Sequence, residues 1–132
     1  MSQPQVYFIV LNYNGYADTV ECLESLQKLN YSDFQVIVVD NASAGGEGER
    51  LAKKFPEFIH LASQTNLGFA EGNNVGIKKA LLDPDCGYVF FLNNDTSVDS
   101  NALNQLLEIA EADDYKNYGS FQPLMVNYYQ RD

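Results

Sequence analysis

Apolar runs of strand length alternate with segments of helical period along most of this sequence. Three of the runs, residues 6–11, 34–39 and 88–92, are continuous and rich in β-branched or aromatic side chains. A strand that is buried on both faces of a parallel sheet has this composition. The alternation therefore predicts an α/β fold with three layers, α/β/α, around a mostly parallel sheet of about five strands.

The other expected elements are shorter or weaker. Residues 58–61 and 121–129 are the remaining expected strands. Helices are expected at residues 17–29 and 47–55, within 68–82, and from Ser100 onward, where Leu103, Leu106, Leu107 and Ala110 form one apolar face. No internal repeat and no linker rich in Pro, Gly or Ser divides the chain, so we expect a single domain over residues 1–132.

The sequence is strongly acidic. It has 18 Asp and Glu against 8 Lys and Arg, a net charge of −10, which argues against nucleic acid as a partner. The N-terminal residues carry no positive charge, and the apolar run after them is too short for a signal peptide or a membrane span. These features predict a cytoplasmic protein that meets a membrane only through its partners, with Cys22 and Cys86 as free thiols.

Polar residues gather directly after three of the expected strands, at residues 12–14, 40–43 and 93–96. In open α/β sheets, ligands bind beyond the carboxyl ends of the strands, so the three clusters are expected to converge on one site. Asn, Asp and Ser are also the usual residues of tight turns and helix N-caps, and this structural interpretation stays open for each cluster.

The three clusters contain no Lys or Arg, and the sequence has neither a G-x-G-x-x-G nor a G-x-x-x-x-G-K-[ST] phosphate-binding motif. A bound diphosphate would therefore need another source of positive charge. Mg²⁺ or Mn²⁺ supplies it through oxygen ligands, commonly carboxylates together with the phosphates. Asp95 is the candidate metal ligand, and in extended geometry the side chain of Asn93 would point the same way. The alternative is that Asp95 only caps a turn.

Four motifs, taken together, match a known family. They are IVLNYN at residues 9–14, VVDNAS at 38–43, NLGFAEGNNVG at 66–76 and LNNDT at 92–96. In this order and spacing they resemble the family 2 glycosyltransferases of the GT-A fold, and most of all the rhamnosyltransferase-like branch. The resemblance extends over nearly the whole chain but covers only the N-terminal, nucleotide-sugar-binding half of the family's proteins. We therefore expect a truncated GT-A domain from which the acceptor half is absent.

The resemblance implies an inverting glycosyltransferase that binds a UDP- or dTDP-linked sugar and transfers the sugar to a hydroxyl of a saccharide or glycan acceptor. Asp40 would accept hydrogen bonds from the base or ribose, and Asn74 would brace the nucleotide loops. Gly68, Gly72 and Gly76 would permit close backbone approach. The nucleotide-binding residues implied in this way are Asn12, Tyr13, Asn14, Asp40, Asn41, Asn66, Gly68, Asn74, Asn93 and Asn94, and the implied metal ligand is Asp95.

The segment Asn93-Asn94-Asp95 is similar to the family's D-x-D metal motif, with Asn93 in place of the first Asp. This replacement removes one negative charge, so metal binding is expected to depend more on oxygens of the diphosphate. The family takes its general base from a segment beyond these motifs, so no catalytic residue is identified and this chain alone is not expected to complete catalysis. His60, the one histidine, is expected to have a structural role.

Two other kinds of function stay open at this point. A receiver-like signalling module also holds Mg²⁺ with acidic residues at strand ends, although no strand here is followed by the Lys that such a module would use. The other is a non-catalytic interaction domain in which the clusters are only turns. If the sheet ends near Tyr129, its last strand would present an unpaired edge, which predicts a homodimer or a partner that covers this edge.

Overall fold

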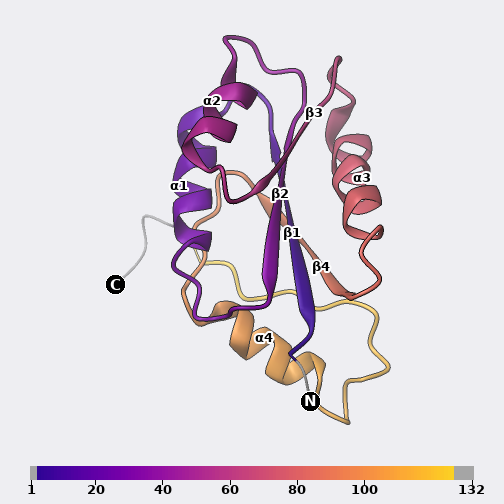
Figure 1. Cartoon of the computed structure of the whole chain (residues 1–132). Helices are drawn as coiled ribbons and strands as arrows, with labels where there is room; N and C mark the ends of the chain where they lie inside the picture. The colour runs from indigo at the N-terminus through magenta and orange to yellow at the C-terminus, as the bar shows by residue number, and fades with distance from the viewer. Residues whose placement is uncertain (1–2, 127–132) are drawn as a thin grey trace.

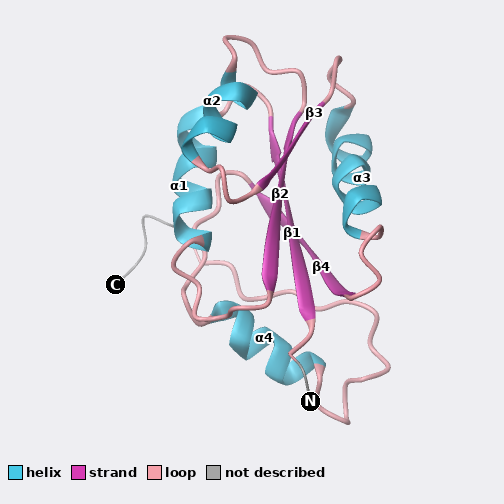
Figure 2. Cartoon of the chain, in the orientation of Figure 1, coloured by secondary structure: helices cyan, strands magenta, loops and turns pink. Residues whose placement is uncertain are grey.

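The computed structural model describes residues 3–126, over which strands and helices alternate (Figure 1; Figure 2). The strands are β1 (Gln5–Asn12), β2 (Phe34–Asp40), β3 (Ile59–Ala62) and β4 (Cys86–Asn93). The helices are α1 (Tyr16–Leu26), α2 (Glu47–Lys54), α3 (Gly68–Ala80) and α4 (Ala102–Ala110). The predicted α/β class is confirmed. Within residues 3–126, no helix combines the length and the apolar character that crossing a bilayer requires.

The four strands form one sheet in the order β3-β2-β1-β4, and each neighbouring pair is parallel. The register pairs Asn12 with Asp40 and Leu11 with Asn93. Strands β1, β2 and β4 therefore end at the same edge of the sheet. This edge brings the three polar clusters together, as predicted.

Helices cover both faces of the sheet and complete the three layers (Figure 1). Helices α1, α2 and α4 contribute Leu23, Leu51 and Leu107 to the larger core, which also contains Phe8 of β1. Helix α3 lies on the opposite face, against the smaller core around Ile9. Phe8 and Ile9 are fully buried. Each such side chain stabilises the fold by about 1.5–3 kcal/mol relative to an exposed one.

Two glycines allow α3 to approach the sheet closely. A Cβ at Gly76 would lie 2.5 Å from Ile9 Cγ2, and a Cβ at Gly72 would lie 2.7 Å from Leu11 Cδ1. The close approach at these two positions is between α3 and side chains of β1. Gly68 differs, because its surroundings are open. Its φ of +79° instead gives it the left-handed conformation that glycine adopts without strain.

The expected fifth strand is absent over residues 121–126, which have no regular secondary structure, and residues 127–129 lie outside the described part of the chain. Leu124 is 90% exposed and Val126 is 70% exposed. An apolar run forms a stable strand only where other strands pair with it and cover it. Over residues 3–126 the sheet therefore has four strands, one fewer than the approximate number expected, with β3 and β4 at its edges. The expected homodimer depended on the edge of a fifth strand, and this strand is absent over residues 121–126.

Candidate functional site

Asn12, at the end of β1, joins two of the polar clusters through its buried side chain. Its Nδ2 lies 2.9 Å from Asp40 Oδ1, 3.0 Å from Ser43 Oγ and 3.0 Å from Glu47 Oε2. Its Oδ1 accepts a hydrogen bond of 2.6 Å from Thr19 Oγ1. The amide nitrogen carries two hydrogens, fewer than the three acceptors around it. The residue is 0% exposed. Asn12 therefore holds the other residues in place, and its side chain is not accessible to a ligand.

Thr19 of α1 extends this network to the third cluster. Asn94 Nδ2 donates a hydrogen bond of 3.0 Å to Thr19 Oγ1. Asn94 also lies against Gly15, where a Cβ would come within 2.7 Å of its Nδ2. One network thus runs from Asn94 through Thr19 and Asn12 to Asp40 and joins the three clusters at one edge of the sheet.

Two hydrogen bonds tie the loop after β1 to the loop after β2. The backbone N–H of Asn14 donates to Ser43 Oγ at 2.9 Å, and the backbone N–H of Ala44 donates to Asn14 Oδ1 at 2.8 Å. Asn14 and Ala42 have φ values of +50° and +64°, in the left-handed region that costs non-glycine residues energy. The cross-links help to hold both loops in this shape.

Asn41 fastens the loop that precedes α3. It is 2% exposed, its Nδ2 donates to Asn66 Oδ1 at 2.9 Å, and its Oδ1 accepts from the backbone N–H of Leu67 at 2.9 Å. Asn66 Oδ1 also accepts from the backbone N–H of Gly68 at 2.8 Å. Asn41, Asn66 and Gly68, which we expected around a nucleotide, are therefore brought together as one structural unit.

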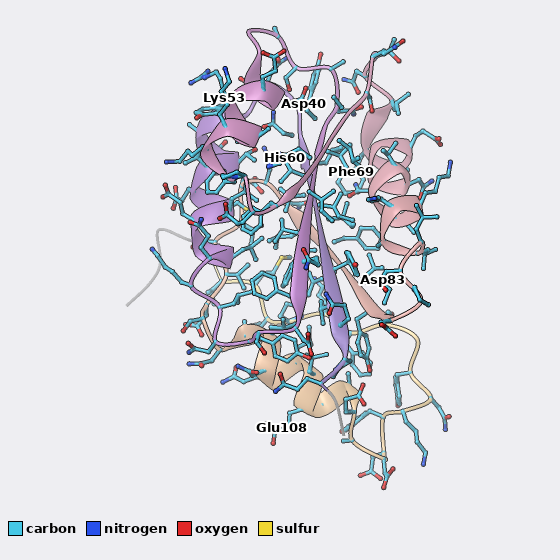
Figure 3. The ribbon with its side chains drawn as sticks, in the orientation of Figure 1. Asp40, Lys53, His60, Phe69, Asp83 and Glu108 are labelled. Atoms are coloured by element: carbon cyan, nitrogen blue, oxygen red, sulfur yellow. The ribbon has the colours of Figure 1, made fainter. Side chains whose placement is uncertain are left out.

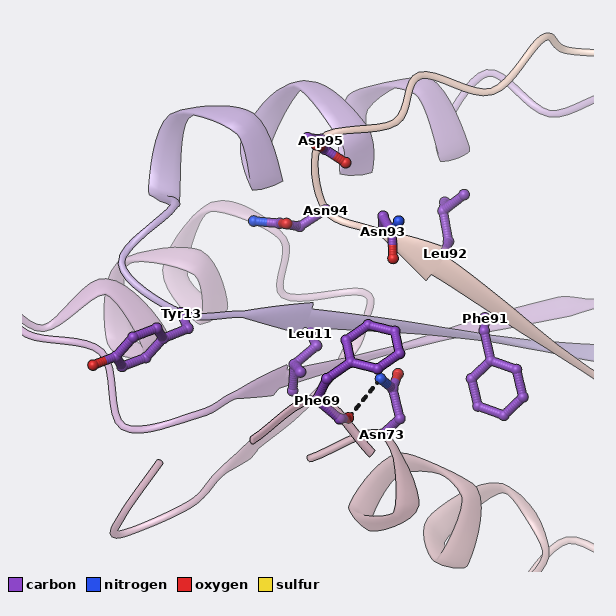
Figure 4. Close-up of a pocket in the computed structure, with 9 residues that line it drawn as sticks. All are labelled: Leu11, Tyr13, Phe69, Asn73, Phe91, Leu92, Asn93, Asn94 and Asp95. Atoms are coloured by element: carbon purple, nitrogen blue, oxygen red, sulfur yellow. Dashed lines mark hydrogen bonds between the residues drawn. The ribbon is translucent and has the colours of Figure 1, made fainter. Parts of the chain in front are cut away.

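A pocket of about 350 Å³ opens where β1 and β4 end (Figure 4). It is formed by Leu11, Tyr13, Phe69, Asn73, Phe91, Leu92, Asn93, Asn94 and Asp95, and we call it the β4 pocket. Tyr13, Phe69 and Phe91 are each at least half exposed, so aromatic faces are available on its walls. No Lys or Arg is among the residues that line it in the described part of the chain.

A second pocket, of about 380 Å³, lies between α2 and β3. Asp40, Ser43, Gly48, Glu49 and His60 are among the residues that line it, and we call it the α2 pocket. Asp40 and Asp95 thus belong to the same sheet edge but line different pockets. His60 Nε2 lies 2.8 Å from the backbone oxygen of Phe55, which agrees with the structural role expected for this histidine.

The turn after β4 departs from the expected geometry. The strand ends at Asn93, and Asn94 and Asp95 form a turn in which Thr96 N–H donates to Asn93 O at 3.1 Å. The prediction that extended backbone would point Asn93 and Asp95 the same way is therefore wrong. Asp95 is exposed. Burial, with a contribution from the nearby charge of Asp95, raises the pKa of the Cys22 thiol to about 12.

The two neighbouring asparagines of α3 have different surroundings. Asn74, expected to brace the nucleotide loops, is exposed, whereas Asn73 is buried and lines the β4 pocket. Asn73 Nδ2 donates to the backbone oxygen of Phe69 at 2.8 Å. Asn73 adjoins Gly72, which faces the sheet, so the helical period could have identified it.

The sequence belongs with known glycosyltransferases. Residues 7–123 match the family described as Glycosyl transferase family 2. An uncharacterized glycosyltransferase of Haemophilus influenzae (strain ATCC 51907 / DSM 11121 / KW20 / Rd) is 30% identical over 110 residues, which are 83% of this chain and 36% of that protein. Poly-beta-1,6-N-acetyl-D-glucosamine synthase of Staphylococcus aureus (strain MSSA476) is 32% identical over 106 residues, which are 78% of this chain and 24% of that protein.

Solved structures of glycosyltransferases have the same fold. The crystal structure of S. aureus TarS 1-349 in complex with UDP is similar with a TM-score of 0.71 and 23% identity, over 81% of this chain and 32% of that chain. The mannosyltransferase PcManGT from Pyrobaculum calidifontis, in complex with GDP-Man and Mn²⁺, is similar with a TM-score of 0.68 and 22% identity, over 86% of this chain and 34% of that chain. The expected GT-A fold is confirmed by these similarities.

The chain spans only part of the curated relatives named above, 36% and 24% of their lengths. The matched region nevertheless includes all four motifs of the sequence, since it extends from residue 7 to residue 123. This match favours a glycosyltransferase over the receiver-like signalling module and the non-catalytic interaction domain. By its sequence and its fold, the chain belongs to glycosyl transferase family 2.

Proposed function

We propose that this chain is the donor-binding domain of an inverting glycosyltransferase, and that it holds a nucleotide-diphosphate sugar at the shared edge of β1, β2 and β4. The observation that carries the proposal is the network from Asn94 through Thr19 and Asn12 to Asp40. It fixes two exposed loops and a pocket relative to one another through bonds within the chain. The known structures support the ligand class, since TarS was solved with UDP and with UDP-GlcNAc and PcManGT with GDP-Man.

The nucleoside would lie at the ends of β1 and β2. Asp40 keeps 8% exposure, and its carboxylate oxygens are acceptors suited to a base N–H or a ribose hydroxyl. Tyr13 is 50% exposed, so its ring is available to stack on a base. Asn14, Asn41, Asn66 and Gly68 would shape the surrounding loops through the hydrogen bonds described above.

The oxygen donors of the turn after β4 fit Mg²⁺ or Mn²⁺. Asp95 offers an exposed carboxylate in the β4 pocket, and Asn93 and Asn94 offer amide oxygens. Over residues 3–126, no group of three or more His, Cys, Asp or Glu side chains is placed to hold a metal ion. A hard cation held by one carboxylate and by diphosphate oxygens suits this donor set. When bound, the metal would stabilise the negative charge that the diphosphate gains as the bond to the sugar breaks.

The chain's own residues would bind and orient the donor, and would leave activation of the acceptor to another part of the enzyme. Asp95 is the one carboxylate among the residues that line the β4 pocket in the described part of the chain. A carboxylate committed to the metal is not available as the general base that removes the acceptor's proton. The sugar would therefore face an acceptor that is deprotonated by residues outside this pocket.

Titration calorimetry tests the proposal with UDP and with dTDP, each with and without Mn²⁺ or Mg²⁺. We expect binding of at least one nucleotide to strengthen with the metal and to weaken again when EDTA is added. Asp95→Ala should abolish the metal effect, and Asp40→Ala should weaken binding about tenfold or more through the lost charged hydrogen bond. Asp113→Ala, which removes an exposed carboxylate with 96% of its side chain accessible, is the matched control and should bind like the wild type.

Absence of nucleotide binding by the wild type under all of these conditions would overturn the proposal. So would Asp40→Ala and Asp95→Ala variants that bind as tightly as the Asp113→Ala control. Selectivity between UDP and dTDP would in addition show which of the two nucleosides the site prefers.

We also propose a homodimer through the free edge of β4. Over the described residues β4 has β1 on one side and no strand on the other, and its sequence, CGYVFFLN, has no charged residue to discourage pairing. An antiparallel pair of β4 strands would satisfy the unpaired backbone groups of both copies. Sedimentation that gives a monomer at high micromolar concentration would contradict the dimer and leave the donor site unaffected.

A further inference from the structure

Three small polar residues lie along one side of α1. Thr19, Cys22 and Ser25 follow one another at intervals of three residues, so each is a neighbour of the next on the helix surface. Their exposures are 0%, 1% and 7%, so all three are covered by other parts of the chain. We call these three residues the α1 ladder.

The first two members of the α1 ladder contact the turn that carries Asp95. Thr19 Oγ1 accepts the 3.0 Å hydrogen bond from Asn94 Nδ2, and Cys22 Sγ lies 3.8 Å from the backbone oxygen of Asn93. Both contacts come from residues directly before Asp95. The side chain of Asp95 is itself exposed, so its position depends on the turn that carries it.

The third member holds the segment after the turn. Ser25 Oγ accepts a hydrogen bond of 3.0 Å from the backbone N–H of Val98 and donates one of 2.6 Å to the backbone oxygen of Cys22. Residues on both sides of Asp95 are thus fastened to the same helix. Because α1 is packed in the larger core through Leu23 and Leu26, it offers a rigid support.

We propose that the α1 ladder positions the turn of Asn93, Asn94 and Asp95 for binding of the divalent metal, with Thr19 as the main positioning residue. This inference rests on the proposed function, because it assigns a role toward the metal that Asp95 would hold. Thr19 contacts neither the metal nor the nucleotide. It acts through Asn94, and it is itself oriented by Asn12, to which it donates its hydroxyl hydrogen at 2.6 Å. Such outer contacts set the orientation of metal ligands.

Gly15 provides a second way to disturb the same contact. A Cβ at this position would lie 2.7 Å from Asn94 Nδ2, so Gly15→Ala would displace the Asn94 side chain. The φ of Gly15 is −131°, so alanine is compatible with the backbone there. Agreement between Thr19→Val and Gly15→Ala would link the effect to Asn94 rather than to packing of α1.

The experiment measures how much Mn²⁺ strengthens UDP binding in the full chain, expressed as the ratio of the dissociation constants without and with the metal. Thr19→Val, which keeps the shape but removes the hydroxyl, should lower this ratio about tenfold or more, as should Gly15→Ala. Thr19→Ser, which restores the hydroxyl, should return it to within about twofold of the wild type. Ile37→Val is the control, because it removes a buried methylene from the opposite core without touching the turn. The dissociation constant without metal is each variant's own reference, so a loss of UDP binding that does not involve the metal leaves the ratio unchanged.

Hydrogen exchange of the backbone amides of residues 94–98 gives a readout that does not depend on a ligand. Exchange there should accelerate in Thr19→Val and stay unchanged in Ile37→Val. The role of the α1 ladder would be overturned if Thr19→Val and Gly15→Ala both gave the same ratio of dissociation constants as the wild type and left amide exchange unchanged. The proposed function would stay intact in that case. A wild type whose UDP binding does not respond to Mn²⁺ would overturn the proposed metal site, and the assignment of the α1 ladder with it.

Discussion

The amide nitrogen of Asn12 lies between two carboxylates, 2.9 Å from Asp40 Oδ1 and 3.0 Å from Glu47 Oε2. The two acids come from different elements, the end of β2 and the start of α2. The amide between the two carboxylates donates hydrogen bonds to both and separates their negative charges. Asn12 is also fully buried, so this role needs an uncharged donor of its size.

We predict that Asn12→Asp destabilises the fold by about 3 kcal/mol or more at neutral pH, because it buries a third carboxylate beside Asp40 and Glu47. Urea unfolding monitored by circular dichroism measures the change. The control is Asn74→Asp, the same chemical change at an exposed position of α3, which should alter stability by no more than about 0.5 kcal/mol. Equal effects of the two substitutions would contradict the central position of Asn12 in the network.

Gly76→Ala should destabilise the fold by about 1–3 kcal/mol, because the added methyl group overpacks the contact between α3 and β1. Its Cβ would lie 2.5 Å from Ile9 Cγ2. The control is Gly119→Ala, at a position with nothing within 4 Å of the added Cβ. Adding Ile9→Ala to Gly76→Ala should cost less than Ile9→Ala costs in the wild type, and additive losses in this double-mutant cycle would refute the proposed clash.

Cys22 should be protected from thiol reagents at pH 8 in the folded protein. Its side chain is 1% exposed, and burial, with the charge of Asp95 as a smaller cause, raises its pKa from 9.0 to about 12. The thiolate is the reactive form, so the Cys86→Ser variant, which leaves only Cys22, should react with a disulfide reagent only after unfolding. Fast reaction of native Cys86→Ser would show that Cys22 is accessible.

The same raised pKa makes stability depend on pH. Below pH 9 the thiol of Cys22 is neutral in both states, and as the pH rises from 9 toward about 12 the unfolded state loses this proton first. Stability should therefore fall with pH in this range. Part of the fall should disappear in Cys22→Ala, as measured by unfolding free energies at pH 8 and pH 10. Equal pH dependence of the wild type and of Cys22→Ala would contradict the shift.

The layers of the fold were predictable because each strand carries its own signal. Residues 88–92 are apolar on both faces, and β4 forms there whatever side chains lie at its end. Residues 121–126 carry a weaker signal, which Gln122 and Pro123 interrupt. They form no strand, because strand formation needs a neighbour to pair with and proline has no N–H for the sheet. Sequence identifies a segment that is able to pair, and the availability of a partner is a property of the whole fold.

The candidate site was predictable where topology alone decides it. Parallel strands run in the same direction, so the residues at or just after their carboxyl ends, Asn12, Asp40 and Asn94, lie at one edge of the sheet. The contact of Thr19 with Asn94 joins residues 75 positions apart and depends on how α1 lies on the sheet. Thr19 is one threonine in a helix and has no local pattern that distinguishes it. Side-chain hydrogen bonds of this kind follow from how the elements pack, and they leave no periodic pattern in the sequence.

The cross-links between Asn14 and residues 43–44 are made only by groups of the chain itself. The conformational entropy of these two loops is therefore lost during folding and not at the moment of binding. A nucleotide that arrives at this edge meets loops already in their final shape. Its association should proceed in a single kinetic phase close to the encounter rate, without a slow closing step after contact.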